Sequence, residues 1–138
     1  MIQEDYCSFE VAKLLKEKGF NEECFALYNP DDMLIQSGIR LNNIQVGRVK
    51  GSYSAPTLQM TMKWLREVYN LHIMVNCIGK VNYDPIVQRF DGKDFEIEGV
   101  EVGTTRCING KWENVRRGFK TYEEACEAAI KYCLKNLI

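Results

Sequence analysis

The sequence has 138 residues, of which 18 are basic and 19 are acidic, so its formal net charge at pH 7 is −1. Its 46% of hydrophobic and 27% of charged residues exclude a disordered or collagen-like chain, and no apolar run approaches the ~20 residues of a membrane span. The length predicts a single domain over residues 1–138, and the acidic start, unlike a basic signal peptide, predicts a cytoplasmic protein without membrane contact.

The first helix is predicted from about Phe9 to Lys18. Ser8 is its expected N-cap, because a serine hydroxyl accepts hydrogen bonds from the unpaired amides of a first turn, and Gly19 supplies a left-handed end. The apolar side chains fall on one arc at about 100° per residue, which predicts an amphipathic surface helix. They are Cys7, Val11, Ala12, Leu14 and Leu15.

The segment after this helix has a weaker pattern. Cys24 to Tyr28 is a short apolar run that predicts a strand, and the Asn-Pro-Asp-Asp turn at residues 29–32 ends it. Between residues 33 and 55, the one predicted strand runs from Ile44 to Val49.

A second helix is predicted from Ser54-Ala55-Pro56 to about Asn70, since Pro56 suits the first helical position, where its missing amide hydrogen is not needed. Apolar side chains cover roughly 200° of its circumference. That width predicts a helix that packs on two sides at the centre of the domain. The stripe contains Leu58, Met60, Thr61, Met62, Trp64, Leu65, Val68 and Tyr69.

Further strands are predicted after this helix, and two pairs of them flank two-residue turns. Asp91-Gly92 and Asn109-Gly110 are the hairpin signals. Strands joined by tight hairpins, rather than alternating with helices, indicate an antiparallel meander. The predicted strands are Leu71–Cys77, Pro85–Phe90, Asp94–Val102 with a bulge at Gly99, Thr104–Ile108 and Lys111–Val115.

The third predicted helix starts with a capping box formed by Thr121 and Glu124. Cys126 and Cys133 lie seven residues apart at the centre of its apolar stripe. Together these elements predict an α+β fold, an antiparallel β-meander with about three helices packed mainly on one face. The opposite face of the sheet is then exposed, and function is expected there.

Six cysteines raise the question of a metal or redox site. None of them form a C-x2-C or C-x4-C pair, and His72 is the only histidine, whereas structural zinc sites usually contain a close pair of ligands. Buried, reduced thiols are therefore predicted, with no metal and no cofactor, and the metal and redox alternatives stay open. The cysteines are Cys7, Cys24, Cys77, Cys107, Cys126 and Cys133.

Catalytic signatures are missing from the sequence. It contains no G-x-G-x-x-G, no G-x-x-x-x-G-K-[ST] and no G-x-S-x-G, and a catalytic role for His72 would require partners that the sequence does not mark. We therefore expect no catalytic residues. A small carboxylate-dependent enzyme remains an alternative, because the 19 acidic residues leave carboxylate chemistry open.

Charge is segregated along the chain although its total is close to zero. Residues 33–66 contain five basic and no acidic residues, and residues 106–120 contain five basic residues and one glutamate. Residues 84–101 sum to −4 and the first 32 residues to −5. Such segregation builds a basic face that binds a polyanion or an acidic partner. The alternative is that these charges are solvated and cluster by chance.

Three blocks of the sequence carry a resemblance. They are residues 7–20 (CSFEVAKLLKEKGF), residues 53–73 (YSAPTLQM, then KWLREV and LHI) and residues 121–128 (TYEEACEA). In this order they resemble small proteins of unknown activity carried by phages and prophages of gut Bacteroidetes. The resemblance implies a mobile-element setting and a cytoplasmic location, and it carries no activity over.

A second resemblance involves the last hairpin. Lys111 to Phe119, leading into the helix start at Thr121, is similar to the three-strand-plus-helix DNA-binding domains of plant transcription factors and phage integrases, whose sheet enters the major groove. A strand that leads into a capped helix is also a common αβ junction. The candidate nucleic-acid or partner contacts are Arg106, Lys111, Trp112, Arg116, Arg117 and Lys120.

The sequence thus favours a non-enzymatic interaction domain of phage or prophage type that acts through protein–protein contacts or self-association. The alternative is a DNA- or RNA-binding module that uses the basic-aromatic hairpin at residues 106–120. The small carboxylate-dependent enzyme is the second alternative.

Overall fold

The computed structural model describes residues 2–78, 82–89, 91–96, 100–101, 105–108, 111–114 and 117–138. For Ile78, Glu96 and the described residues from 100 to 117, it describes the backbone alone. The helices are α1 (Phe9–Glu17), α2 (Asn43–Val46), α3 (Leu58–Tyr69) and α4 (Tyr122–Tyr132), which continues into the π-helical turn η1 (Cys133–Leu137). The strands are β1 (Cys24–Tyr28), β2 (Leu34–Leu41), β3 (Tyr53–Ser54), β4 (Leu71–Ile78), β5 (Asn82–Arg89), β6 (Asp94–Glu96), β7 (Val100–Glu101), β8 (Thr105–Ile108), β9 (Lys111–Asn114) and β10 (Arg117–Gly118).

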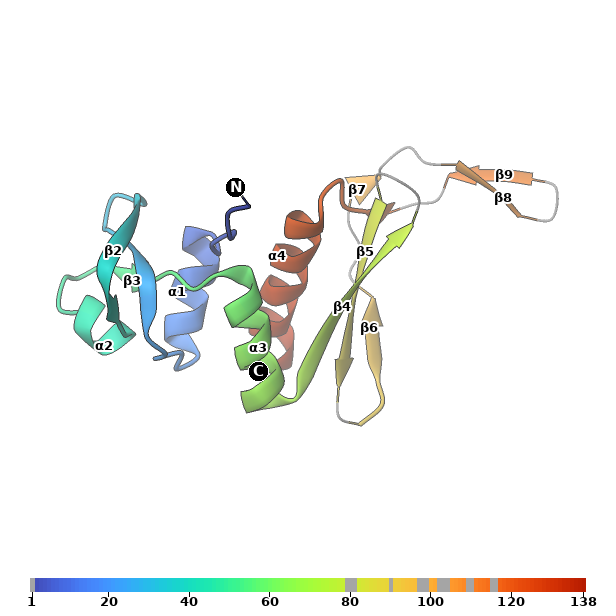
Figure 1. Ribbon diagram of the computed structural model, residues 1–138. Helices are drawn as coiled ribbons and strands as arrows, with labels where there is room; N and C mark the ends of the chain where they lie inside the picture. Colours follow the sequence, from blue (N-terminus) through green and yellow to red (C-terminus); the bar gives the residue numbers. More distant parts are fainter. Residues whose placement is uncertain are drawn as a thin grey trace.

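Helices α1, α3 and α4 lie between two small antiparallel sheets (Figure 1). One sheet has the order β2-β1-β3 and contacts α1 through β3, and the other is the meander β4-β5-β6, which contacts α3 and α4. The predicted α+β fold is confirmed, and the meander is present within it. The first sheet, most of which was not predicted, lies on the other side of the helices.

The helix caps form where the sequence predicts them. The Ser8 hydroxyl accepts a hydrogen bond from the Val11 amide at 3.2 Å, and Gly19 ends the segment with a φ of +88°. At the start of α4, the Thr121 hydroxyl accepts from the Glu124 amide at 3.1 Å, but the Glu124 carboxylate does not accept from the Thr121 amide, so only half of the predicted capping box forms. These are local interactions, so a local pattern suffices to predict them.

The strand predicted from Ile44 to Val49 is wrong. A short helix, α2, occupies this region, because Asn42 and Gln45 cap each other. The Asn42 side chain accepts from the Gln45 amide at 3.0 Å, and the Gln45 side chain accepts from the Asn42 amide at 2.9 Å. This reciprocal cap satisfies two amides and outweighs the weak apolar alternation.

The central helix starts later than its proline predicts. Thr57 is the N-cap of α3 and accepts from the Met60 amide at 3.1 Å, so Pro56 precedes the helix instead of opening it. At the other end Asn70 is left-handed, with a φ of 54°, and β4 begins at the next residue. Helix α3 and strand β4 are therefore joined without a loop.

Both predicted hairpins are present in the backbone. Strand β5 pairs with β6, and β8 pairs with β9 in a register that places Ile108 opposite Lys111. Strand β5 begins at Asn82, earlier than predicted. The predicted bulge at Gly99 and the turn residues Asn109 and Gly110 lie outside the described residues.

The core lies around the helices and contains most of the cysteines. Trp64 of α3 packs edge-to-face against Phe20 at a centroid distance of 5.3 Å. The prediction of buried thiols is confirmed for Cys7, Cys24, Cys126 and Cys133, whereas Cys77 is exposed and the Cys107 side chain is outside the description. Burial raises the pKa of Cys133 to about 12, so this thiol stays protonated at neutral pH.

Helix α1 is joined to α4 by polar contacts at two levels. The Ser8 amide donates to the Glu127 carboxylate at 3.2 Å, and the Ser8 hydroxyl donates to the same oxygen. One and two turns beyond Glu127, Lys131 and Lys135 form ion pairs with Glu10 at 3.0 Å and 2.8 Å. These contacts fix the two helices side by side.

None of the helices in the described part of the chain is long and apolar enough to cross a membrane. The cytoplasmic location stays a prediction.

We expect Gly118→Ala to destabilise the fold by about 1–3 kcal/mol, because the added methyl group would overlap the side chain of Asn82, which is buried. Urea unfolding measures this loss. Gly38→Ala is the matched control, since a Cβ there would meet no atom within 4 Å. Equal stabilities of the two variants would contradict the close packing of β10 against β5.

We expect the stabilising effect of Glu10 to depend on pH. Hydrogen bonds and ion pairs to Lys135 and Lys131 lower the pKa of Glu10 from 4.5 to about 2. The folded state therefore holds this proton less tightly than the unfolded state, so the effect is complete above a pH of about 4.5 and is lost as the pH falls towards 2. Urea unfolding of wild type and Glu10→Gln across this pH range measures the contribution of Glu10 to the free energy of unfolding.

Glu17→Gln is the control for the pH series, since Glu17 is an exposed carboxylate of α1 that forms no ion pair within the described residues. A difference between wild type and Glu10→Gln that stays constant across the pH range would contradict the prediction.

Candidate functional site

The structure describes the predicted basic hairpin mainly through its backbone. Arg106 of β8 lies opposite Glu113 of β9, and Cys107 lies opposite Trp112. The side chains of Arg106, Lys111, Trp112 and Arg117 are not described, and Arg116 lies outside the described residues altogether. The hairpin is confirmed, and the basic face that it was predicted to build stays a prediction.

The six predicted nucleic-acid or partner contacts are also divided between two strand pairs. Arg117 belongs to β10, which pairs with β7 and places Arg117 opposite Glu101, not opposite a residue of β8 or β9. Lys120 is exposed and lies between the Phe119 bridge to Tyr83 and the cap of α4. The structure therefore does not place these six residues on one pair of strands.

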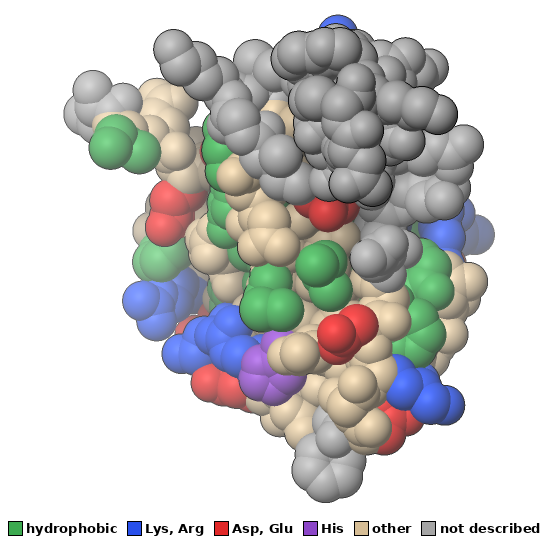
Figure 2. Space-filling view, turned by 90° about the vertical axis from the view of Figure 1, so that its right-hand side faces the viewer, with side chains coloured by type: hydrophobic (Ala, Val, Ile, Leu, Met, Phe, Trp, Pro, Cys, Tyr) green, Lys and Arg blue, Asp and Glu red, His purple; other side chains and the backbone are tan. Residues whose placement is uncertain are grey.

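The outer face of the meander, where function was expected, does not gather one kind of side chain among its described residues. Figure 2 shows this side, with apolar, basic and acidic side chains interspersed around the single histidine. The His72 ring lies 2.8 Å from the Asn70 side chain, within hydrogen-bond distance, and Met74 lies opposite Ile86 on the neighbouring strand. No catalytic or binding cluster is built there by the described residues.

Exposed apolar side chains gather elsewhere, on the first sheet and α2. Seven of the eleven large hydrophobic residues that are exposed in the described part of the chain fall between residues 25 and 49. Their exposed fractions run from 41% for Leu34 to 71% for Ile44. We call this set the β2 surface; it consists of Phe25, Met33, Leu34, Ile35, Ile39, Ile44 and Val49.

Strand β2 is exposed on both of its faces. Leu34 lies opposite Tyr28 and Ile35 lies opposite Leu27, so the two apolar neighbours point to opposite sides of the sheet, yet both are more than 40% exposed. Among the described strands β2 pairs with β1 alone, which leaves its outer edge of backbone amides and carbonyls without a strand partner. One face of a strand normally packs against a core, whereas both faces of β2 are exposed.

The register of β2 is interrupted after its first three residues. Gln36 lies opposite Ala26, but Leu41 lies opposite Cys24, so residues 37–40 form an irregularity against β1. Within it, the Arg40 guanidinium lies 4.9 Å from the centroid of the Phe25 ring. A bulge of this kind limits simple pairing of two such edges.

Charges of both signs accompany the β2 surface: exposed Asp31 and Asp32 precede it, and Glu4 and Glu23 line a pocket together with Arg40. Residues 33–50 include Arg40, Arg48 and Lys50 and no acidic residue, and all three cations are exposed. The charge pattern of the sequence showed this basic segment. Its exposed apolar side chains were missed, because residues 33–43 follow neither a helical nor an alternating pattern.

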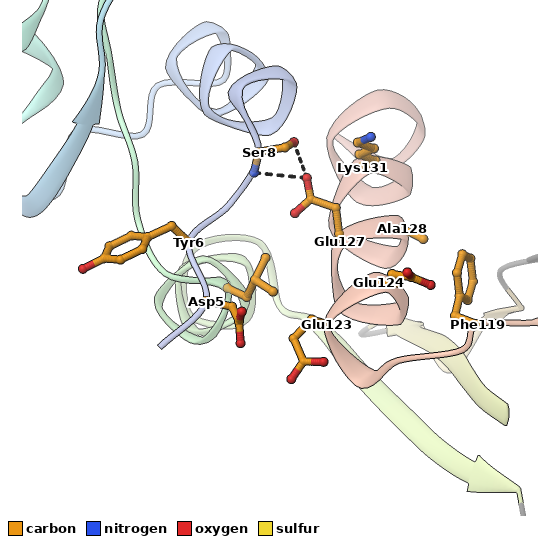
Figure 3. Close-up of a pocket in the computed structure, with 10 residues that line it drawn as sticks. Asp5, Tyr6, Ser8, Phe119, Glu123, Glu124, Glu127, Ala128 and Lys131 are labelled. Atoms are coloured by element: carbon orange, nitrogen blue, oxygen red, sulfur yellow. Dashed lines mark hydrogen bonds between the residues drawn. The ribbon is translucent and has the colours of Figure 1, made fainter. Parts of the chain in front are cut away.

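A second feature is a groove of about 560 Å³ between the N-terminal segment and α4 (Figure 3). Its apolar lining residues are Tyr6, Leu58, Phe119 and Ala128, of which Tyr6 turns its ring away from α4 in Figure 3. Polar side chains surround this lining, and Figure 3 shows Asp5 and Glu123 on facing sides of the opening. The polar lining residues are Asp5, Ser8, Glu123, Glu124, Glu127 and Lys131.

The carboxylates of this groove differ in what they bind. Glu127 accepts two hydrogen bonds from Ser8, and Lys131 is paired with Glu10. The carboxylates of Asp5, Glu123 and Glu124 form no hydrogen bond or ion pair with other described residues. Three carboxylates without an ion-pair partner among the described residues therefore line the groove, together with Lys131, which is paired with Glu10.

These carboxylates do not form a metal site. Within the described residues, no three His, Cys, Asp or Glu side chains are placed to hold one ion. The sequence did not predict the groove, because its walls come from residues 5–8, 58 and 119–131, which only the tertiary fold brings together.

Comparison with known proteins identified no relative: no protein-family model, no curated protein and no solved structure matches the chain. The resemblances to phage and prophage proteins and to three-strand-plus-helix DNA-binding domains therefore stay predictions.

Proposed function

We propose that this chain is a protein-interaction domain that acts through the β2 surface. The observation that carries the proposal is the concentration of exposed apolar side chains between residues 25 and 49, where strand β2 is exposed on both faces. Single exposed apolar residues are ordinary, but a gathered set of this kind marks an interaction site. Covering a half-exposed isoleucine or methionine contributes on the order of 1 kcal/mol, so burying several of them is sufficient to drive association.

A protein partner suits this surface better than a lipid membrane. The outer edge of β2 has backbone amides and carbonyls without a strand partner in the described chain, and the hydrocarbon of a bilayer offers them no hydrogen bonds. A protein can cover the apolar side chains and satisfy these groups at the same time.

Photo-crosslinking tests the proposal. We expect a benzoylphenylalanine placed at Ile39, which is 64% exposed, to form covalent adducts with protein, in the purified chain and in cells that produce it. The matched control is Val68 of α3, which is 56% exposed and lies outside the β2 surface. Equal yields at the two positions, or no adduct from Ile39, would refute the proposal.

Nucleic-acid binding by the β8–β9 hairpin is a second candidate. The observation in its favour is a hairpin that extends away from the helices in Figure 1 and has Arg106, Lys111 and Trp112 on its two strands. Basic and aromatic residues together suit phosphate contacts and base stacking.

A mobility-shift assay with random duplex DNA across a salt series tests this candidate. We expect Arg106→Glu/Lys111→Glu, which reverses one charge on β8 and one on β9, to abolish the shift without changing the melting temperature, because phosphate contacts require positive charge. Lys63→Glu/Arg66→Glu makes the same change of charge on α3 and is expected to keep the shift. The absence of a wild-type shift, or a shift that does not weaken with salt, would contradict nucleic-acid binding.

A further inference from the structure

The outer edge of β2 has a defined backbone geometry. The Ala26 carbonyl accepts from the Ala55 amide at 2.9 Å, so the backbone groups of Ala26 point to the β3 side of the sheet. Ala26 lies opposite Gln36, and in an antiparallel pair Gln36 then turns its own N–H and C=O away from β1. Gln36, and Leu34 two residues before it, therefore present these groups at the outer edge, and neither bonds to another part of the described chain.

An extended strand fits this edge better than a helix or a flat surface. Leu34 and Ile35 are exposed on opposite faces of the sheet. A helix laid against the sheet would cover one of these faces, whereas a strand added at the edge has side chains on both. The added strand also bonds to the free amides and carbonyls. The partner is therefore a strand with an open edge and apolar side chains on both of its faces.

Strand β2 of a second copy has these properties. We propose that two copies of this chain form a symmetric dimer in which their β2 strands pair antiparallel around Ile35. The inference rests on the proposed function and names its partner. The two three-stranded sheets would join into one continuous sheet through β2. In Figure 1 the first sheet lies at the end of the molecule beyond α1, away from α3 and α4.

The positions of the free backbone groups place the two-fold axis at Ile35. Leu34 and Gln36 stand on either side of Ile35, so a pairing centred there sets Leu34 of each copy opposite Gln36 of the other. All the free N–H and C=O groups of these residues then have partners. The two Ile35 residues form the close, non-hydrogen-bonded pair, with Cα atoms about 4.5 Å apart and side chains in contact on one face.

Neighbouring registers meet irregular backbone. A pairing centred on Leu34 would set Gln36 opposite Asp32, which lies in the turn with a φ of +63°. A pairing centred on Gln36 would set Leu34 opposite Gly38, within the irregularity at residues 37–40. The bulge thus limits the pairing to residues 34–36. Because the symmetric contact uses both β2 edges, association stops at the dimer.

Charge is compatible with this dimer but does not select it. Arg40 lines a pocket together with Glu4 and Glu23 of its own chain. Antiparallel pairing keeps the two copies of Arg40 at opposite ends of the contact, whereas parallel pairing would place them side by side. The geometry of the free edge, and not charge, identifies the partner.

Opposite charges at Ile35 test the inference. We expect wild type to form a concentration-dependent dimer in sedimentation velocity. Ile35→Lys and Ile35→Glu are each expected to associate at least about tenfold more weakly, because an apolar contact is lost and like charges face each other across the axis. An equimolar mixture of the two variants restores the dimer, since opposite charges then face each other.

Controls separate this effect from a general effect of charge. Val68 of α3 is 56% exposed outside the β2 surface, so Val68→Lys and Val68→Glu are expected to dimerise like wild type. Gln36→Pro removes the outward amide without removing a hydrogen bond to β1, and it is expected to abolish the dimer. Gln36→Val keeps the amide and is expected to keep the dimer. Circular dichroism confirms that each variant is folded.

The outcomes distinguish this inference from the proposed function. A wild-type chain that stays monomeric, Ile35 variants that dimerise like wild type, or a mixture that does not restore the dimer would each overturn β2 pairing. If Ile39 nevertheless forms adducts with other proteins in cells, the β2 surface remains an interaction site with a different partner. If wild type is monomeric and Ile39 forms no adduct, both proposals are wrong.

Discussion

The carboxylate of Glu127, which accepts hydrogen bonds from the amide and hydroxyl of Ser8, is the contact on which the rest of the structure depends. It joins the start of α1 to the middle of α4 across 119 positions of sequence. Because the first sheet contacts α1 and the meander contacts α4, this contact sets how the two sheets stand on either side of the helices. It also fixes the width of the groove, since Ser8 and Glu127 lie in its walls.

The features that could be predicted from the sequence are those that depend on residues close together in the sequence. The caps at Ser8 and Thr121, the strand from Cys24 to Tyr28 and the two hairpins each depend on contacts within a few positions or on a turn dipeptide. Strand β2 was not predicted, because a strand with apolar side chains on both faces lacks the alternation that a half-buried strand shows. The groove was not predictable either, since Tyr6 and Phe119 meet only after the chain has folded.

A net charge of −1 conceals segments of opposite sign. Residues 33–50 contribute cations to the first sheet and α2, and the N-terminal segment and α4 contribute carboxylates around the groove. Within the fold the two signs also meet, since Arg40 lines one pocket together with Glu4 and Glu23. Summing charge over the whole chain therefore says little about what it binds, whereas its distribution over the folded surface is informative.

The single left-handed residue between α3 and β4 has a mechanical consequence. Asn70 turns the chain from helix to strand with no intervening loop, so α3 and the first strand of the meander are directly connected. A rotation of α3 in the packed helical layer must then tilt β4 and, through its hydrogen bonds, β5. Strain applied to the helices on one side of the molecule would be transmitted to the outer sheet on the other.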